Sequence, residues 1–181
     1  MVGKGKLLIA EPFLGDPNFE RSVILLCEDD ENGTLGLVLN KPSALKVNDV
    51  LEDMNEFNQP LYIGGPVDQD CVNFIYTGIN VVDDSVEISD GVFMGGDFDQ
   101  LFELARFGKV NPDNFRFFLG YSGWDVNQLT MEMNEKTWIV GNTSLHEILL
   151  MAPPLMWHNI LKSMGGKYKM YSNYPIDPRL N

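Results

Sequence analysis

Short hydrophobic runs of β-forming residues recur along the chain, and they constrain its fold more than any other feature. Several of these runs are hydrophobic at every position. Continuous rather than alternating hydrophobicity is typical of strands that are covered on both faces. The predicted strands span residues 6–10, 22–27, 34–40, 61–65, 72–77, 91–96, 115–121 and 137–140.

Helices are predicted where capping residues precede hydrophobic segments. Asp97, Asp125 and Ser144 each stand three residues before a Gln or Glu, which is the spacing of a capping box. A shorter helix is predicted within 47–54, and a further one over 155–165, where hydrophobic residues recur close to helical spacing.

The order of these elements predicts the fold class. Strands outnumber helices and do not alternate with them, which indicates an α+β protein rather than a doubly wound sheet. Residues 1–181 contain no repeat, linker or change of composition that would mark a second domain, so a single domain is predicted. Residues 166–181 are predicted to form an extended C-terminal tail, because their end contains two prolines and shows no hydrophobic period.

The charge balance is strongly acidic. The chain has 13 basic and 26 acidic residues, a net charge of −13. A field of this sign repels phosphate backbones and disfavours direct binding to nucleic acid. No hydrophobic run approaches membrane-spanning length, and the N-terminal run is too short for a signal peptide. We therefore expect a cytoplasmic protein that does not bind membranes.

Cysteines and histidines show no metal-binding pattern. Cys27 and Cys71 lie at the edges of hydrophobic runs with no C-x-x-C spacing, so both are predicted to be buried thiols in strands. His146 and His158 have no second ligand at a suitable spacing, and no metal site is predicted. Phosphate-binding and dinucleotide-binding glycine motifs are absent from the sequence, so no cofactor is predicted.

Residues 120–124, GYSGW, are similar to the G-x-S-x-G turn that carries the nucleophile of many hydrolases. Gly123 comes one position too early for that turn, and Trp124 stands where the second glycine is required. The segment is therefore predicted to be a strand-to-helix corner. In this corner Gly123 permits the turn, Asp125 caps the next helix and Trp124 is a packing anchor.

Three glycine-rich corners are predicted: GGP (64–66), GGD (95–97) and residues 120–124. Strand ends that gather at one edge of a sheet form a common kind of ligand crevice, although the same glycines would equally serve turns with positive φ. Capping carboxylates at Asp97 and Asp125 would repel a phosphate, which favours a neutral or cationic ligand or a peptide. The predicted ligand-binding residues are Asn40, Pro42, Gly64, Gly65, Pro66, Gly95, Gly96, Asp97, Tyr121, Gly123, Trp124 and Gln128.

Several segments resemble the YqgE/AlgH family of bacterial proteins in their order and spacing. They are GKLLIAEPFLGDPNFERSVILLCE, GTLGLVLNKP, GGPV, GGD and GYSGWDVNQL, and the resemblance extends from Gly5 to Met151. One departure is Asn127, where the family usually has glycine. The resemblance implies a mixed β-sheet, bifurcated or barrel-like, that is flanked by helices.

The same resemblance implies a protein that is often labelled a transcriptional regulator, because of a link to alginate production. No helix-turn-helix with a basic recognition helix supports that label in this chain. The family's activity is unassigned, and the resemblance supplies no catalytic residues.

Two functional hypotheses remain open at this point. The first is a regulatory module, more a binding protein than an enzyme, that binds a protein partner or a small ligand rather than DNA. The alternative is an enzyme, either a hydrolase or a thiol-dependent enzyme, that uses Ser122 or Cys27 as its nucleophile. This enzyme would need a base within hydrogen-bond reach of the nucleophile, and the chain has only His146 and His158 as histidines.

Overall fold

The computed structural model describes residues 2–141 and 144–176. Within these residues the chain forms ten strands, six α-helices and one 3-10 helix. In chain order they are β1 (Leu7–Ala10), β2 (Val23–Asp30), β3 (Gly33–Val38), β4 (Pro42–Lys46), α1 (Val47–Val50), β5 (Pro60–Ile63), β6 (Val67–Thr77), β7 (Val86–Ser89), β8 (Val92–Met94), α2 (Phe98–Arg106), η1 (Pro112–Asn114), β9 (Phe115–Trp124), α3 (Gln128–Asn134), β10 (Trp138–Gly141), α4 (Leu145–Leu150), α5 (Pro153–Met164) and α6 (Gly166–Tyr171).

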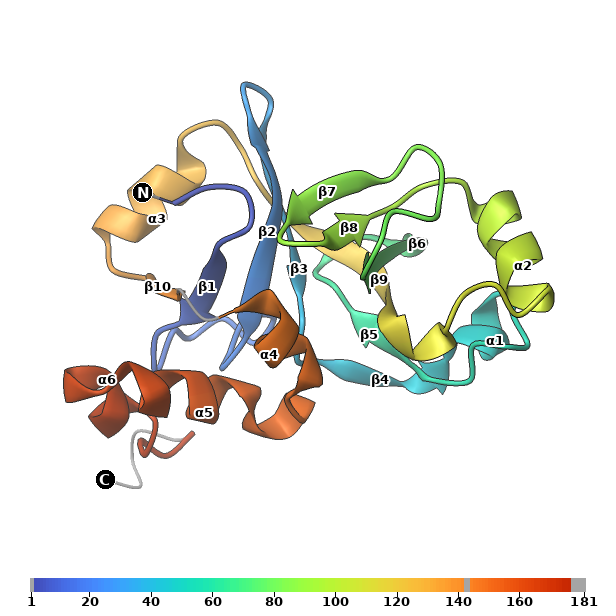
Figure 1. Ribbon diagram of the computed structural model, residues 1–181. Coiled ribbons are helices and arrows are strands. Elements are labelled where there is room, and N and C mark those ends of the chain that lie inside the picture. Colours follow the sequence, from blue (N-terminus) through green and yellow to red (C-terminus); the bar gives the residue numbers. More distant parts are fainter. Residues whose placement is uncertain (1, 142–143, 177–181) are drawn as a thin grey trace.

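The strands form one branched, unclosed sheet in the order β10-β1-β2-β3-β9-β6-β8-β7. Strand β5 is a further neighbour of β9, and β4 pairs with β5. The β5–β9 pairing is parallel, whereas the other pairings are antiparallel. Figure 1 shows the result as two halves that meet at β3 and β9. The α+β class is therefore confirmed, with a mixed sheet that is bifurcated rather than closed.

Strand β9 belongs to both halves of this sheet. Its last residues, 122–124, pair with β3, while residues 115–119 pair with β6 and two of them also pair with β5. The predicted corner at residues 120–124 is therefore wrong, because the strand continues to Trp124. Gly120, with φ of 64°, bends the strand without ending it, and a Cβ atom there would overlap the carbonyl oxygen of Val67.

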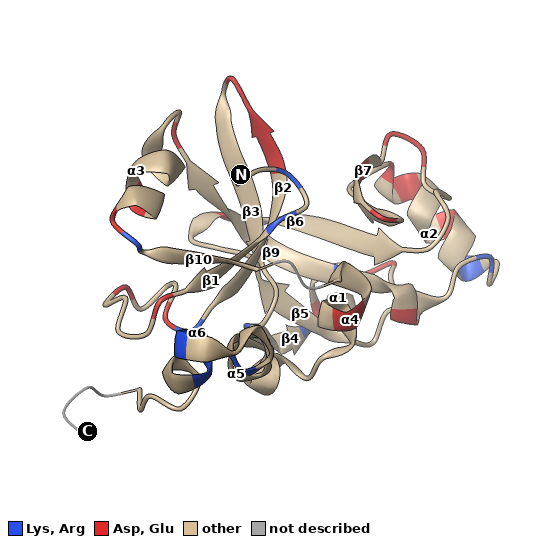
Figure 2. Cartoon of the chain, turned by 60° about the vertical axis from the view of Figure 1, so that its left-hand side comes forward, with Lys and Arg blue, Asp and Glu red and all other residues tan. Residues whose placement is uncertain are grey.

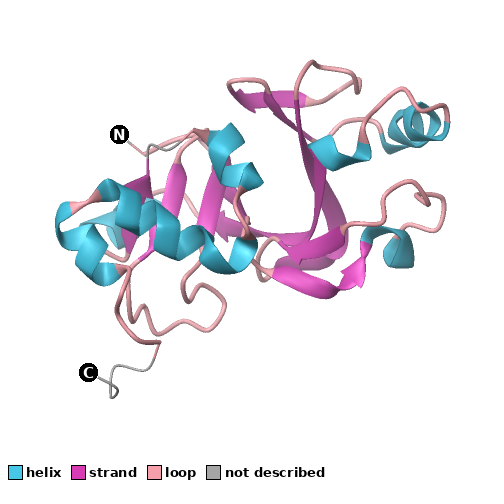
Figure 3. Cartoon of the chain, turned by 60° about the horizontal axis from the view of Figure 1, so that its bottom comes forward, coloured by secondary structure: helices cyan, strands magenta, loops and turns pink. Residues whose placement is uncertain are grey.

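The first half of the sheet is covered on both faces, as its continuous hydrophobic runs predict. In β1, Leu7 and Ile9 belong to a core cluster shared with α4 and α5. Leu8 and Ala10 point to the opposite face, into a cluster that includes Leu129 of α3. In Figure 3 the C-terminal helices lie across the strands of this half. Alternating side chains of one strand thus enter two separate cores.

The second half has an aromatic core. Phe74, Tyr76 and Phe117 are fully buried there and pack with residues of α1 and α2. Helix α2 is capped as predicted, because the side chain of Asp97 accepts hydrogen bonds from the N–H groups of Asp99 and Gln100. The side chain of Gln100 instead accepts from the N–H of Asp83, which ties the helix to the loop before β7.

The cap predicted at Asp125 is wrong, and the one predicted at Ser144 is right in position only. Helix α3 follows Asn127, whose φ of 68° is left-handed, and Asp125 makes no side-chain cap. The side chain of Gln128 instead accepts from the N–H of Asp125. Asparagine tolerates the left-handed conformation better than most residues, which explains how it replaces the family's glycine. Helix α4 follows Ser144, but that side chain makes no capping hydrogen bond.

The C-terminal segment is not extended over its first part. Gly165, with φ of 70°, ends α5, and residues 166–171 form helix α6. Tyr168 and Tyr171 of this helix pack against the core cluster, and His158 of α5 bonds to the carbonyl of Ser172. These contacts order a segment too short to show a hydrophobic period. The prediction for residues 177–181 lies outside the described residues.

We predict that Gly65→Ala destabilises the protein. A Cβ at this position would overlap the backbone of Tyr121 and Ser122, and these atoms cannot move without disturbing β9. We expect a loss at or above the upper end of the ~1–3 kcal/mol typical of overpacking, measured by urea denaturation. The matched control is Gly3→Ala, where only the end of the Asp29 side chain is near. A stability within ~0.5 kcal/mol of wild type would contradict the expected strain.

Candidate functional site

The structure brings two of the three predicted glycine corners together. Gly64 donates its N–H to the carbonyl of Leu119 at 2.8 Å, and its own carbonyl accepts from Ser122 Oγ at 3.1 Å. Both Gly64 and Gly65 are buried against β9, and a Cβ on either would overlap the backbone of that strand. These glycines thus permit close packing of strands, and the space beside them is filled by protein.

The segment after β3 lies beside the same junction. The N–H of Ile63 donates to the carbonyl of Lys41 at 2.8 Å, and Pro42 is opposite Tyr62 in the β4–β5 pairing. The side chain of Asn40 points elsewhere, because it accepts from the N–H of Val23 and donates to the carbonyl of Arg21, both at 2.9 Å. The amide of Asn40 therefore joins two backbone segments.

The third corner lies apart from this junction, at the passage from β8 to α2. Gly95 donates its N–H to the carbonyl of Phe74, and Gly96 packs against Val82 and Asp83. Asp97 caps α2. Gly95 and Gly96 both have positive φ, so they serve the turns that were the alternative interpretation of these glycines. A role for the corner residues in ligand binding stays a prediction.

Tyr121, Gly123 and Trp124 line a shallow depression of about 410 Å³ near the β2–β3 hairpin. Pro66 is exposed next to the junction. The carboxylates of Glu28, Asp30 and Asp125 also line the depression, so it is electrostatically unsuited to an anion.

Trp124 and Gln128 take part in a structural network around Glu132. The carboxylate of Glu132 accepts from the indole N–H of Trp124 at 2.9 Å and from that of Trp138 at 2.7 Å. Gln128 Nε2 donates to its second oxygen at 2.9 Å. Trp124 is only 5% exposed, which agrees with its predicted role as a packing anchor. Burial of both indoles is possible because their N–H groups share this acceptor.

The two candidate nucleophiles lack an activating base. Ser122 is fully buried, and its hydroxyl donates to the carbonyl of Gly64. The imidazoles of His146 and His158 bond instead to the carbonyls of Asp90 and Ser172, each at 2.9 Å. Neither histidine is therefore hydrogen-bonded to a candidate nucleophile.

The thiols differ from each other in environment. Cys27 is 1% exposed, as predicted, and burial raises its pKa well above the ordinary range, so the thiol stays protonated. The prediction that Cys71 is also buried is wrong, because it is exposed. It lies in the first part of β6, where the pairing with β9 is irregular between Val67 and Val72 and the side chains project into solvent.

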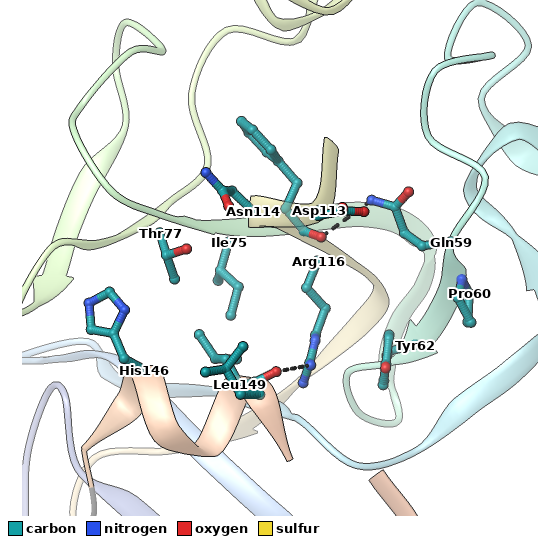
Figure 4. A pocket seen from close by; sticks show the side chains of 12 residues that line it. Gln59, Pro60, Tyr62, Ile75, Thr77, Asp113, Asn114, Arg116, His146 and Leu149 are labelled. Atoms are coloured by element: carbon teal, nitrogen blue, oxygen red, sulfur yellow. Dashed lines mark hydrogen bonds between the residues drawn. The ribbon is translucent and has the colours of Figure 1, made fainter. Parts of the chain in front are cut away.

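A different cavity carries the most distinctive chemistry among the described residues. It has a volume of about 270 Å³ and lies between α4 and the strands β5, β6 and β9. Figure 4 shows its side chains converging from these elements. We call it the Arg116 cavity, and its lining residues are Gln59, Pro60, Tyr62, Ile75, Thr77, Asp113, Asn114, Phe115, Arg116, His146, Leu149 and Leu150.

Arg116 reaches this cavity because side chains alternate along β9. Phe115 and Phe117 enter the aromatic core, whereas Arg116 and Phe118 project to the opposite face. The guanidinium donates from Nη1 to the carbonyl of Leu39 at 3.1 Å and from Nη2 to that of Leu149 at 2.8 Å. It thereby connects β9 with the end of β3 and with helix α4.

The Arg116 charge has no acidic counterpart. Its guanidinium carbon lies 4.7 Å from the centre of the Tyr62 ring, a cation–π contact. Among residues 2–141 and 144–176, no carboxylate lies within ion-pair distance of it. Burial lowers the pKa of Arg116 from its ordinary value, and the neighbouring Tyr62 opposes this shift. An arginine nonetheless remains protonated at neutral pH, so the cavity contains a fixed positive charge.

Other polar groups surround this charge. Gln59 Nε2 donates to the carbonyls of Pro112 at 3.1 Å and Phe115 at 3.3 Å, which fixes the cavity edge near η1. One ring nitrogen of His146 is engaged with the carbonyl of Asp90, and no described residue is hydrogen-bonded to the other. Thr77 and Asn114 add a hydroxyl and an amide to the lining.

The sequence prediction missed Arg116, Tyr62 and Gln59, and considered His146 only as a possible metal ligand or catalytic base. A signal was present, because Arg116 is the one charged residue in the run FRFFLGY. An arginine inside a strand that is covered on both faces must be buried or must line a cavity. The predicted ligand-binding residues were instead taken from the glycine-rich corners and their neighbours.

The described residues contain neither a metal-binding cluster nor a membrane-spanning helix. Within the described part of the chain, no three His, Cys, Asp or Glu side chains cluster in a way that could hold a metal ion. None of the described helices is both long enough and apolar enough to cross a bilayer.

The chain is similar to proteins of one bacterial family. The model of the AlgH-like family matches residues 7–169. A UPF0301 protein of Cytophaga hutchinsonii is 49% identical over 182 residues, covering 100% of both chains. A UPF0301 protein of Chlorobium limicola is 42% identical over 177 residues, covering 98% of this chain and 95% of its own. The names of these relatives state no reaction, ligand or partner.

Two solved structures have the same fold. The solution structure of AlgH from Pseudomonas aeruginosa matches with a TM-score of 0.73 and 28% identity, over 94% of this chain and 93% of that one. A crystal structure of a protein from Corynebacterium diphtheriae matches with a TM-score of 0.78 over 96% of this chain and 93% of that one. Its identity of 24% shows the fold alone.

We predict that a thiol reagent labels the two cysteines at very different rates. Cys71 is exposed, so the reagent should label it rapidly in the native protein. Cys27 is buried and protonated, so it should be labelled only when the protein transiently unfolds around it. The Cys71→Ser variant should therefore be almost unreactive in the native state and should react fully in urea. Rapid native labelling of this variant, followed by mass spectrometry, would reverse the assignment.

Proposed function

This chain belongs to the AlgH-like family, and we propose that it is a regulatory module that binds a small ligand rather than an enzyme or a DNA-binding protein. The observation that carries the proposal is the uncompensated charge of Arg116 beside a cavity of about 270 Å³. This volume is near the lower bound of ~300 Å³ for small-molecule sites, and the mixture of apolar walls with few polar groups is typical of them.

The alternative as an enzyme finds less support. Ser122 is a buried hydroxyl bonded to a backbone carbonyl, and Cys27 is a buried, protonated thiol. A covalent mechanism requires an exposed nucleophile that is activated by a nearby base. Within the described residues, neither side chain is exposed and neither is hydrogen-bonded to a base.

Charge also argues against direct DNA binding. Figure 2 shows acidic segments on the β2–β3 hairpin and around α2, while the main basic group is the small one on α5 and α6, with Lys162, Lys167 and Lys169. The net charge of −13 repels a polyanion, and a DNA-binding surface needs clustered lysines and arginines.

Binding at the Arg116 cavity can influence other parts of the molecule. Arg116 holds the carbonyls of Leu39 and Leu149, so one side chain connects β9, β3 and α4. A ligand that competes for the guanidinium would alter these contacts, which is a physical route from occupancy of the cavity to the position of α4.

The cysteine usage noted above, without metal or disulfide spacing, supports action in the reducing cytoplasm.

We predict no sequence-specific retardation of duplex DNA by the isolated protein at physiological salt. Electrostatic repulsion should prevent the phosphate contacts on which such binding depends. The measurement is a gel-shift titration with genomic fragments, with excess competitor DNA as the control. Retardation of a particular fragment at ~10⁻⁸ M protein, the usual range of specific binders, would contradict this part of the proposal.

We predict that native mass spectrometry against a library of small metabolites finds ligands whose binding is lost in Thr77→Trp. Thr77 lines the Arg116 cavity, and an indole there would occupy the space that a ligand needs. The matched control is Ile79→Trp, because Ile79 is 78% exposed and lies two residues away on the surface. Ligands that bind both variants equally, or a complete library without a bound compound, would contradict the proposed site.

A further inference from the structure

Arg116 has unused hydrogen-bonding capacity directed at the cavity. A guanidinium carries five N–H groups. Among the described residues, the carbonyls of Leu39 and Leu149 accept from two of its nitrogens, and no other acceptor is bonded to it. A partly buried charge without an opposite partner is unfavourable, because the two carbonyl bonds and the cation–π contact offset only part of its desolvation. An anion in the cavity would supply both the missing acceptors and the opposite charge.

The geometry of the guanidinium limits what that anion can be. The ring of Tyr62 covers one face of the planar group, so a ligand has access to an edge rather than to that face. The edge of a guanidinium presents parallel N–H groups that match the two oxygens of a carboxylate. Figure 4 shows the guanidinium end of Arg116 among Leu149 and Tyr62, at one side of the cavity.

The other lining residues indicate what kind of ligand body the cavity can hold. Ile75 and Leu149 form apolar walls, and Pro60 and Leu150 extend them. A volume of about 270 Å³ suits a molecule the size of a small aromatic or branched aliphatic acid and is too small for a nucleotide or a polymer.

The negative charges of the protein limit how much negative charge the ligand can carry. Asp113 also lines the cavity, and the whole chain carries a net charge of −13. Arg116 can compensate one negative charge, and a second one would be opposed by Asp113 and by the overall field. A monoanion is thus favoured over a phosphate ester.

From these observations we infer that the Arg116 cavity recognises a small monocarboxylic acid with an apolar body, its carboxylate bonded to the edge of Arg116. The inference rests on the proposed function as a ligand-binding module and names the chemical class of the ligand. The predicted glycine corners play no part in this site.

The inference is tested with three probes that share a phenyl ring: benzoate, its neutral and nearly isosteric analogue benzamide, and the larger, more highly charged phenyl phosphate. Each is titrated into the ¹⁵N-labelled full chain, and chemical shifts are followed for the backbone of Thr77 and Leu149 and for the side-chain Nε–H of Arg116. We expect benzoate to shift these signals and to bind at least about tenfold more tightly than the other two probes, because it alone makes charge-assisted bonds without excess charge.

Variants separate recognition from folding. Arg116→Lys keeps the positive charge but loses the paired N–H groups, and it should weaken benzoate binding at least about tenfold. Arg106→Lys, at the exposed end of α2, is the matched control and should bind as wild type does. Backbone spectra of both variants report whether the fold is kept.

The outcomes distinguish this inference from the broader proposal. Benzamide or phenyl phosphate binding in the Arg116 cavity as tightly as benzoate would overturn the carboxylate inference and leave the ligand-binding module intact. Equal binding of benzoate by a folded Arg116→Lys variant would also overturn it. So would the absence of any shift at Thr77, Arg116 or Leu149 with benzoate.

Discussion

The contact between Gly64–Gly65 and Gly120–Ser122 is the constraint on which this architecture depends. Strand β9 has β3 and β6 as antiparallel neighbours and β5 as a parallel one, and it can hold all three only because backbone meets backbone at this crossing. A side chain on any of these glycines would separate the strands and open the branch of the sheet. The branch in turn sets β5 and β6 opposite α4, and the Arg116 cavity is the space left between them.

Much of the fold was predictable from the sequence, because buried strands consist of recognisably hydrophobic segments. Each predicted hydrophobic run became a strand, and Asp97 capped its helix. The strands β4 and β7 were missed because few of their side chains are buried, so hydrogen bonds to a neighbouring strand define them more than a hydrophobic pattern does. Helix α6 was missed for a related reason. Its stability comes from Tyr168 and Tyr171 packing on a distant core rather than from a local pattern.

The candidate site was harder to predict than the fold. A glycine-rich segment can indicate a ligand site, but turns with positive φ and closely packed strands require glycine as well. In this protein, close packing of strands explains Gly64, Gly65 and Gly120. Arg116 is surrounded in sequence by phenylalanines, and its importance depends on which elements face it. The carbonyls of Leu39 and Leu149 and the ring of Tyr62 come from three separate parts of the chain. Only the three-dimensional arrangement shows that no carboxylate of the described residues lies within ion-pair distance of it.

The distribution of the tryptophans has a consequence for spectroscopy. Trp124 and Trp138 share the carboxylate of Glu132, and Trp157 bonds to the carbonyl of Ala10 at 2.8 Å, so all three indoles belong to the half of the molecule built on β1 and β10. None of them lines the Arg116 cavity, and the aromatic core of the other half consists of phenylalanine and tyrosine. Trp157 alone shares a core cluster with lining residues of the cavity, Tyr62 and Ile75, so a ligand could change tryptophan emission only indirectly, through that cluster.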